Sequence, residues 1–141
     1  MMNTKKEFYR VMATQTEIAL ATSIENIPNV RLVNFIFDEE KDIIYFTTFG
    51  DNEKVKEFEV NDQVAFTTVP HNGNEHVRAS GVVRKSEMTI FDVAESFKEK
   101  IISYGNTIEQ AGEFLVLYEI SFTEAVVTLD FENTDIIKLY K

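Results

Sequence analysis

The stretch Thr47-Thr48-Phe49-Gly50-Asp51-Asn52-Glu53-Lys54 carries the residue types from which a phosphate-binding loop can be built. Two hydroxyls stand at the end of a predicted strand, a glycine permits a tight turn, and a lysine falls in the first turn of the predicted helix. The free N–H groups of a helix N-terminus bind anions, and a lysine there opposes the helix dipole by roughly a few tenths of a kcal/mol. Lys54 therefore fits a nearby anion, whereas Glu53 argues against one, and Lys54 is otherwise an ordinary surface residue.

Two arginines lie inside predicted strands. Arg31 belongs to the apolar run Val30-Arg31-Leu32-Val33-Asn34-Phe35, and Arg78 lies in the later run His76-Val77-Arg78-Ala79-Ser80-Gly81. An arginine in such a strand either extends its head group to solvent or reaches an anion at the rim of the sheet. The residues themselves leave both interpretations open.

Hydrolytic and metal-dependent chemistry find little support in the residue pattern. The two histidines, His71 and His76, are separated by a predicted hairpin turn, which is not the spacing of a metal pair on one helix or strand face. No G-x-S-x-G motif is present, and the acidic pairs fall in turns or on helix faces. We therefore predict no metal site, and we assign no catalytic side chain.

Composition limits the classes of partner. The 141 residues contain 14 Lys+Arg against 24 Asp+Glu, a formal net charge of −10 that would repel a nucleic-acid backbone. The absence of cysteine excludes disulfides and thiolate chemistry and favours a cytoplasmic location. The N-terminus lacks the apolar run of a signal peptide, and no apolar stretch approaches the roughly 20 residues of a membrane helix. We expect neither nucleic acid nor a membrane as a partner.

The hydropathy pattern alternates between the periods of helices and strands. Thr4 and Glu7 have the spacing of a capping box, which predicts a helix to about Thr14, and a single helix is expected from Thr89 to about Tyr104. Glu25–Asn29 is expected to form a turn. The predicted strands cover residues 17–24, 30–37, 43–48, 63–69, 75–85, 114–122, 125–131 and 136–139, with a short helix after residue 52. This order predicts one mainly β domain over residues 1–141, an antiparallel barrel with helices packed outside.

The order of these pieces resembles the pyridoxamine 5′-phosphate oxidase-like, FMN-binding split-barrel family. The matching stretches are Ala19-Leu20-Ala21-Thr22, Pro28–Phe35, Ile44-Tyr45-Phe46-Thr47-Thr48 with Lys54, and His76–Gly81. The resemblance covers about residues 4–130. It implies a six-stranded split β-barrel that forms a homodimer, with FMN in a groove at the subunit interface.

The resemblance also assigns cofactor-binding residues. Arg31 would pair with the FMN phosphate, and the backbone of Leu32, Val33 and Asn34 would run along the flavin. Phe46 and Thr47 match an aromatic–threonine pair at the flavin, and Lys54 matches a phosphate-binding lysine. Thr48 belongs to the same expected cradle, and His76 aligns with a polar flavin contact.

Departures from the family pattern bear on the activity. The true pyridoxamine phosphate oxidases end in a segment with a Trp and an Arg-x-His motif, whereas this chain has no Trp and ends Ile136-Ile137-Lys138-Leu139-Tyr140-Lys141. The chain is more similar to short bacterial members of the nitroimidazole-resistance and general-stress type. The resemblance implies an FMN-dependent oxidoreductase acting on a small molecule, with a nicotinamide donor or oxygen. The alternatives are a non-enzymatic flavin- or haem-binding module, a deazaflavin protein, and a barrel whose cofactor site has been lost.

Overall fold

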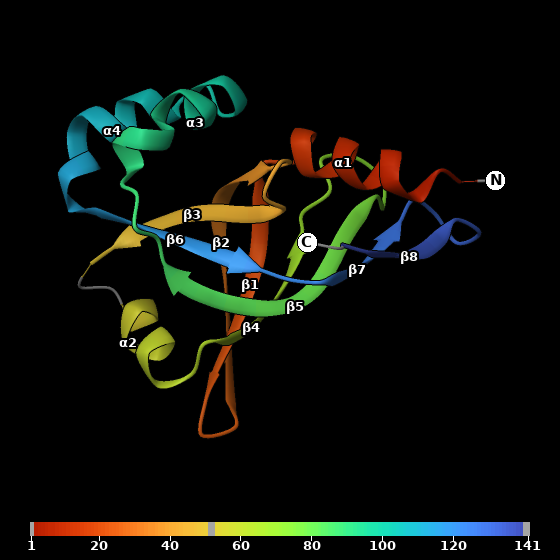
Figure 1. The fold of residues 1–141 in the computed structure, drawn as a ribbon, viewed down its shortest axis with the longest axis horizontal. Coiled ribbons are helices and arrows are strands. Elements are labelled where there is room, and N and C mark those ends of the chain that lie inside the picture. Colours follow the sequence, from red (N-terminus) through yellow and green to blue (C-terminus); the bar gives the residue numbers. More distant parts are fainter. Residues whose placement is uncertain (1, 51–52, 140–141) are drawn as a thin grey trace.

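The structure, a computed structural model, describes residues 2–50 and 53–139, and it gives the backbone alone for residues 53 and 54. Its strands form one antiparallel sheet in the order β4-β1-β2-β3-β6-β5-β7-β8, and an additional pairing of β4 with β5 closes the first six into a barrel (Figure 1). The strands are β1 (Glu17–Ile24), β2 (Ile27–Asp38), β3 (Ile43–Phe49), β4 (Gln63–Thr68), β5 (His76–Lys85), β6 (Leu115–Ser121), β7 (Glu124–Thr128) and β8 (Thr134–Lys138). The predicted six-stranded antiparallel barrel with flanking helices is confirmed.

Alternation along β1 separates the inside of the barrel from its outside. In β1, Ile18 and Leu20 are fully buried, while Ala19 and Ala21 between them are only partly covered. The same period of two fills the interior with aromatic and β-branched side chains. The core includes Ile18, Leu20, Val33, Phe35, Ile44, Phe46, Val64, Phe66, Val77, Val83, Tyr118, Ile120, Ala125 and Val127.

The barrel is split along β5. One edge of this strand pairs with β4 from Arg78 to Val82, while its other edge pairs first with β7 through Arg78 and then with β6 from Val82. Gly81 lies where the partner changes, and a Cβ built on it would stand 2.5 Å from the Ser121 carbonyl oxygen. A glycine is therefore required at this point, because any side chain would collide with the backbone of β6.

The first helix, α1 (Thr4–Thr14), places Phe8, Val11 and Met12 in the core, as its spacing predicts. The expected capping box is wrong. Asn3 is the N-cap, and its side-chain oxygen accepts a hydrogen bond from the Lys6 N–H at 3.2 Å. The Asn3 side chain, one residue before Thr4, already accepts from a free N–H group of the first turn. The Thr4 hydroxyl instead donates to Asp135 of β8 at 2.5 Å.

The single helix expected over residues 89–104 is also wrong. The chain forms η1 (Ile90–Val93), α3 (Ala94–Lys100) and α4 (Tyr104–Ala111), with an extended backbone at Ile101. The break lets Phe97 and Tyr104 stack, with ring centres 4.6 Å apart, in a second core on the outer face of β3 and β6. Two packed aromatic rings outweigh the helical propensity of the linking residues.

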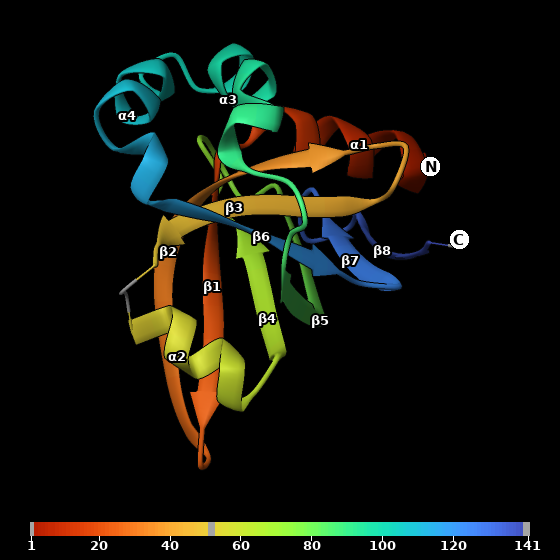
Figure 2. The same ribbon diagram turned by 60° about the vertical axis from the view of Figure 1, so that its left-hand side comes forward.

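The helices lie at two ends of the barrel. In Figure 2, α1, α3 and α4 gather at the upper end, whereas α2 (Glu53–Val60) lies beside the lower ends of β1, β2 and β4. The expected turn at residues 25–29 is tighter than predicted: Glu25 and Asn26 both have positive φ, and β2 already begins at Ile27. No helix in the described ranges is both long and apolar enough to cross a membrane.

Candidate functional site

The register of the paired strands places two rows of outward-facing side chains across the barrel. The first row runs through directly opposed residues from β2 to β8, and the second runs beside it from β2 to β5. The first row is Leu32, Ala19, Thr67, Arg78, Val126 and Ile136, and the second is Val30, Ala21, Ala65 and Ser80. Three strands, β1, β4 and β5, thus present small or short polar side chains at neighbouring positions, which leaves a shallow floor between larger residues.

This floor is the base of a groove of about 710 Å³. Ala19, Ala21 and Ala65 lie along it, and backbone and side chains of β5 and β7 form its far wall. The groove is open to solvent along the strands, so a flat ring can lie over the alanines without displacing any core side chain. Its volume is that of an ordinary small-molecule or cofactor site.

Arg78 supplies the positive charge of the groove. The other charged residue in the lining is Glu124, which stands opposite Lys138 in the β7–β8 ladder. Arg78 is exposed, and within the described part of the chain no carboxylate forms an ion pair with it. The hydroxyl-bearing residues Thr67 and Ser80 flank it, so the groove combines an apolar floor with one cation and two hydroxyl groups.

Arg31 points the other way, into the barrel end beside α2. Its Nη2 donates to Glu57 Oε1 at 3.0 Å, and Asn29 Nδ2 donates to the same oxygen at 3.1 Å. The Thr22 hydroxyl donates to the second oxygen of Glu57. Burial by itself raises the pKa of Glu57, but these hydrogen bonds and the charge of Arg31 outweigh it and hold that pKa below its ordinary value.

The strand alternation divides the other expected residues of β2 and β3 between the two faces. Leu32 and Asn34 are exposed on the outside of β2, whereas Val33 lies in the core. In β3 the Thr47 hydroxyl shares a 2.5 Å hydrogen bond with the Tyr104 hydroxyl. Phe46 and Thr48 face inward and are buried.

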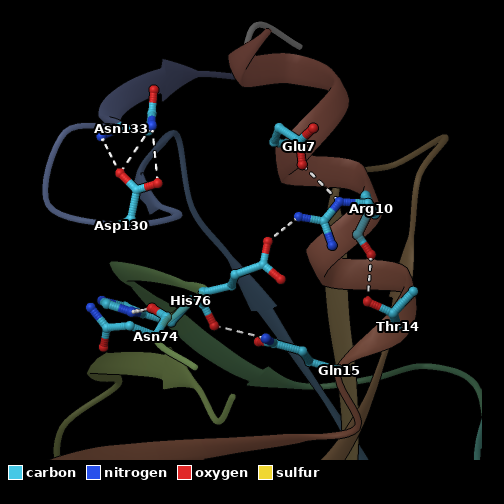
Figure 3. Close-up of polar contacts among 9 residues, drawn as sticks. Glu7, Arg10, Thr14, Gln15, Asn74, His76, Asp130 and Asn133 are labelled. Carbon is cyan, nitrogen blue, oxygen red and sulfur yellow. Dashed lines mark hydrogen bonds and ion pairs between the residues drawn. The ribbon is translucent and has the colours of Figure 1, made fainter. Parts of the chain in front are cut away.

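The remaining expected residues lie at separate places. Lys54 belongs to the first turn of α2, and its side chain lies outside the described residues, as do Asp51 and Asn52. His76 begins β5 on the same strand face as Arg78, and its Nδ1 stands 2.7 Å from the Asn74 carbonyl oxygen (Figure 3). Nearby, Arg10 of α1 binds both Glu7 and Glu75, which ties this end of β5 to the helix (Figure 3).

The groove contains residues that the sequence interpretation did not assign. For Arg78 the sequence leaves open whether it reaches solvent or an anion, Ala19, Ala21 and Ser80 belong to stretches that match the family, and Ala65 and Thr67 carry no sequence assignment. The available signal was the alternation of alanines with Ile18 and Leu20 in one strand. Small residues on the outward face of a strand indicate a surface that something else covers.

Comparison with known proteins identifies the family to which this architecture belongs. The sequence signature of the family described as pyridoxamine 5′-phosphate oxidase-like matches residues 11–134. The chain belongs to this family. No curated protein matches the sequence. The barrel, the split at β5 and the helices at its two ends are thus this chain's version of the pyridoxamine 5′-phosphate oxidase-like fold.

Solved structures show the same fold at low identity. General Stress Protein 26 from Bacillus anthracis has a TM-score of 0.72 at 16% identity, and the match covers 98% of this chain and 100% of that one. A FAD-binding protein from Mesorhizobium loti has a TM-score of 0.64 at 12% identity, with 85% and 90% covered. A heme binding protein from Mycobacterium smegmatis has a TM-score of 0.77 at 12% identity, with 98% of this chain and 59% of that chain covered.

Proposed function

We propose that this member of the pyridoxamine 5′-phosphate oxidase-like family binds FMN on the outer face of its barrel and acts as an oxidoreductase on a small molecule. The observation that carries the proposal is the groove of about 710 Å³, whose floor is made of small side chains and whose one unpaired cation is Arg78. A FAD-binding protein among the solved structures with this fold supports a flavin.

The residues of the groove fit the parts of a flavin. Ala19, Ala21 and Ala65 offer a flat apolar surface for the ring, and the hydroxyls of Thr67 and Ser80 offer hydrogen bonds to its polar edge. Arg78 offers a charge for an anionic group. A bound flavin supplies hydride and electron transfer, while the protein binds it and excludes competing reactions. No side chain of the chain is assigned as an acid or base.

The family resemblance assigns further cofactor-binding residues, and most of them lie on strands next to the groove. Leu32 stands opposite Ala19, so the outer face continues from the groove to β2. We place Leu32, Val33, Asn34 and Phe46 along the ring, chiefly through backbone groups. Arg31, Thr47, Thr48 and Lys54 are the proposed phosphate residues, and His76 is a proposed polar contact. Arg31 already pairs with Glu57 through Nη2, so a phosphate would compete with Glu57 for this guanidinium.

The same face favours a homodimer with the cofactor between the subunits. Val30 is 67% exposed and Leu32 59% exposed at one end of the two rows, and Ile136 is 52% exposed at the other end. Exposed apolar residues on both sides of a small-residue floor are typical of a surface that a second chain covers. We propose that this second chain closes the groove over the flavin in the cytoplasm.

Haem is the second candidate, and His76 favours it. The Asn74 carbonyl engages Nδ1, which leaves Nε2 as the ring nitrogen that a metal would take. A heme binding protein also has this fold. In this case the chain would bind or store a cofactor without turnover.

The test is a visible absorption spectrum of the purified protein before and after addition of FMN, with bound cofactor separated by gel filtration. We expect the two bands of oxidised flavin to co-elute with protein at the size of a dimer. A single intense haem band that disappears in His76→Ala supports the second candidate instead. No bound cofactor after addition of FMN, and none after a parallel addition of haem, would overturn both.

Variants then locate the cofactor. Arg78→Ala is expected to weaken FMN binding by about tenfold or more, since it removes a charge-assisted contact. Arg31→Ala with Lys54→Ala tests the phosphate residues in the same way. Lys98→Ala is the matched control, because Lys98 is an exposed cation on α3 that pairs with Glu95. Protein-dependent oxidation of NADH or NADPH with a quinone or nitro compound tests for turnover.

A further inference from the structure

Lys100, the last residue of α3, holds its amine in an unusual environment away from the groove. Nζ donates to the Met12 carbonyl oxygen at 2.9 Å and stands 3.6 Å from the centre of the Phe35 ring. Within the described ranges no carboxylate forms an ion pair with it. Met12 lies in the last turn of α1, where carbonyl groups lack partners within the helix, so the amine caps α1.

Lys100 and Met12 line a pocket of about 310 Å³ between α1, β2 and α3. Ser96 lines the pocket with Lys100, since residues four apart share one helix face. The lining residues that come from α1 and β2 have no titratable side chains. Besides Lys100 itself, Glu99 of α3 is the titratable residue of the lining. The lining residues besides Lys100 are Met12, Ala13, Ile36, Phe37, Ser96 and Glu99. A small molecule that enters here meets the lysine at the pocket wall.

Burial changes the protonation of this lysine. Removal from water lowers the pKa of Lys100 from 10.5 to about 7, although the Phe35 ring and the C-terminal end of α3 both favour the cation. Near neutral pH a large share of the amine is therefore uncharged. Its donation to the Met12 oxygen uses one N–H and leaves the lone pair free.

We propose that Lys100 and this pocket form a covalent binding site for small uncharged aldehydes. The amine lone pair attacks the carbonyl carbon, and a proton moves from nitrogen to the carbonyl oxygen. The resulting hydroxyl takes up a proton from solvent and leaves as water while the nitrogen lone pair forms the C=N bond, so the nitrogen keeps its last hydrogen as a protonated imine; no oxidant or reductant is needed. The groups around Nζ suit the product: a protonated imine keeps one N–H for the Met12 oxygen, and its charge faces the Phe35 ring.

Two residues of the pocket lining carry groups of the kind that this proton transfer uses. The Ser96 hydroxyl can donate to the carbonyl oxygen, and the Glu99 carboxylate can accept the proton that nitrogen releases. The pocket volume admits a chain of a few carbons but not a flavin or a haem. The site shares no lining residue with the groove, so it does not depend on the proposed cofactor.

The test is reductive trapping with butanal and cyanoborohydride at pH 7, followed by peptide mass spectrometry of each lysine. We expect Lys100 to be alkylated about tenfold or more faster than the exposed Lys98, because its larger neutral fraction outweighs its lower intrinsic nucleophilicity. The rate at Lys100 is expected to level off above about pH 7, where its amine is mostly neutral. Equal rates at the two lysines would overturn the proposal.

Two variants separate the pocket from the amine. Ser96→Leu fills the pocket and keeps the lysine, so the rate at Lys100 should fall by about tenfold while the rate at Lys98 is unchanged. Lys98→Arg removes a neighbouring lysine and should leave labelling of Lys100 intact. Circular dichroism melts confirm that each variant is folded. An undiminished rate at Lys100 in folded Ser96→Leu would show that the pocket plays no part.

Discussion

The Arg31 guanidinium and the Glu57 carboxylate bind each other at 3.0 Å between β2 and α2, with 21% and 9% of their side chains exposed. Glu57 thereby links α2 to the end of the barrel through three partners, and it occupies the arginine that the family resemblance assigns to a phosphate. Breaking this ion pair would therefore do two things together: it would free Arg31 for a phosphate, and it would loosen the attachment of α2 to the barrel.

We predict that Glu57→Gln lowers the free energy of unfolding by about 3 kcal/mol, because it leaves a largely buried guanidinium without its counter-charge. Urea denaturation of both proteins measures the difference. Glu95→Gln is the matched control: it breaks an exposed pair with Lys98 and should change stability by less than about 0.5 kcal/mol. If Arg31 is a phosphate residue, folded Glu57→Gln should also bind FMN more tightly than the parent.

Lys100 predicts a specific dependence of stability on pH. The unfolded chain binds its proton up to about pH 10.5 and the folded chain only to about pH 7, so stability rises with pH between these values. Lys100→Met removes this effect. Relative to the parent, the stability of the variant should be higher at pH 6 than at pH 9 by about 3 kcal/mol, because about two pH units of this interval lie above the folded pKa and each is worth about 1.4 kcal/mol.

Thermal or urea unfolding at the two pH values measures this difference. Lys98→Met is the control: Lys98 lies on the exposed face of α3, where it pairs with Glu95 three residues earlier, so the pH dependence that arises from Lys100 should persist in this variant. A Lys100→Met difference that is the same at pH 6 and pH 9 would mean that the amine stays charged in the folded protein.

Gly81→Ala should destabilise the barrel by about 2 kcal/mol or more. Its Cβ would stand 2.5 Å from the Ser121 carbonyl oxygen and 3.0 Å from Ile120 Cγ2, so β5 and β6 must separate where the barrel splits. Gly105→Ala in α4 meets only Lys98 side-chain atoms at ordinary distance, and it should be neutral or stabilising. Denaturation curves of the two variants give the comparison, and equal effects would contradict the close approach.

Filling the groove should separate ligand binding from stability. Ala21→Leu places a larger side chain on the outward floor, and we expect about tenfold weaker FMN binding with a stability change below about 1 kcal/mol. Thr107→Leu, at an exposed position of α4, is the control and should bind as the parent does. Equilibrium titration followed by absorbance measures both. Unchanged affinity in Ala21→Leu would place the flavin elsewhere.

Much of the fold follows from local pattern. Alternation in residues 17–24 and helical spacing of Phe8, Val11 and Met12 are physical consequences of strand and helix periods, so these elements and their buried faces could be predicted. The closure of the strands into a six-stranded barrel, by contrast, was predicted from the family resemblance and not from local pattern. The helix break after Lys100 was missed, because the stacking of Phe97 on Tyr104 is a tertiary contact that no local propensity encodes.

The candidate site depends more heavily on tertiary structure. The sequence pattern was enough to predict the number and order of the strands, the position of Arg31 and Arg78 within them, and the alternation of Ala19 and Ala21 with Ile18 and Leu20, although it placed the start of β2 three residues late. Only the strand register brings Ala19, Thr67 and Arg78 into one row, because opposed residues come from segments far apart in the chain. Likewise, only packing of α2 against the barrel end sets Glu57 against Arg31 and so turns an expected anion-binding arginine into half of a buried ion pair.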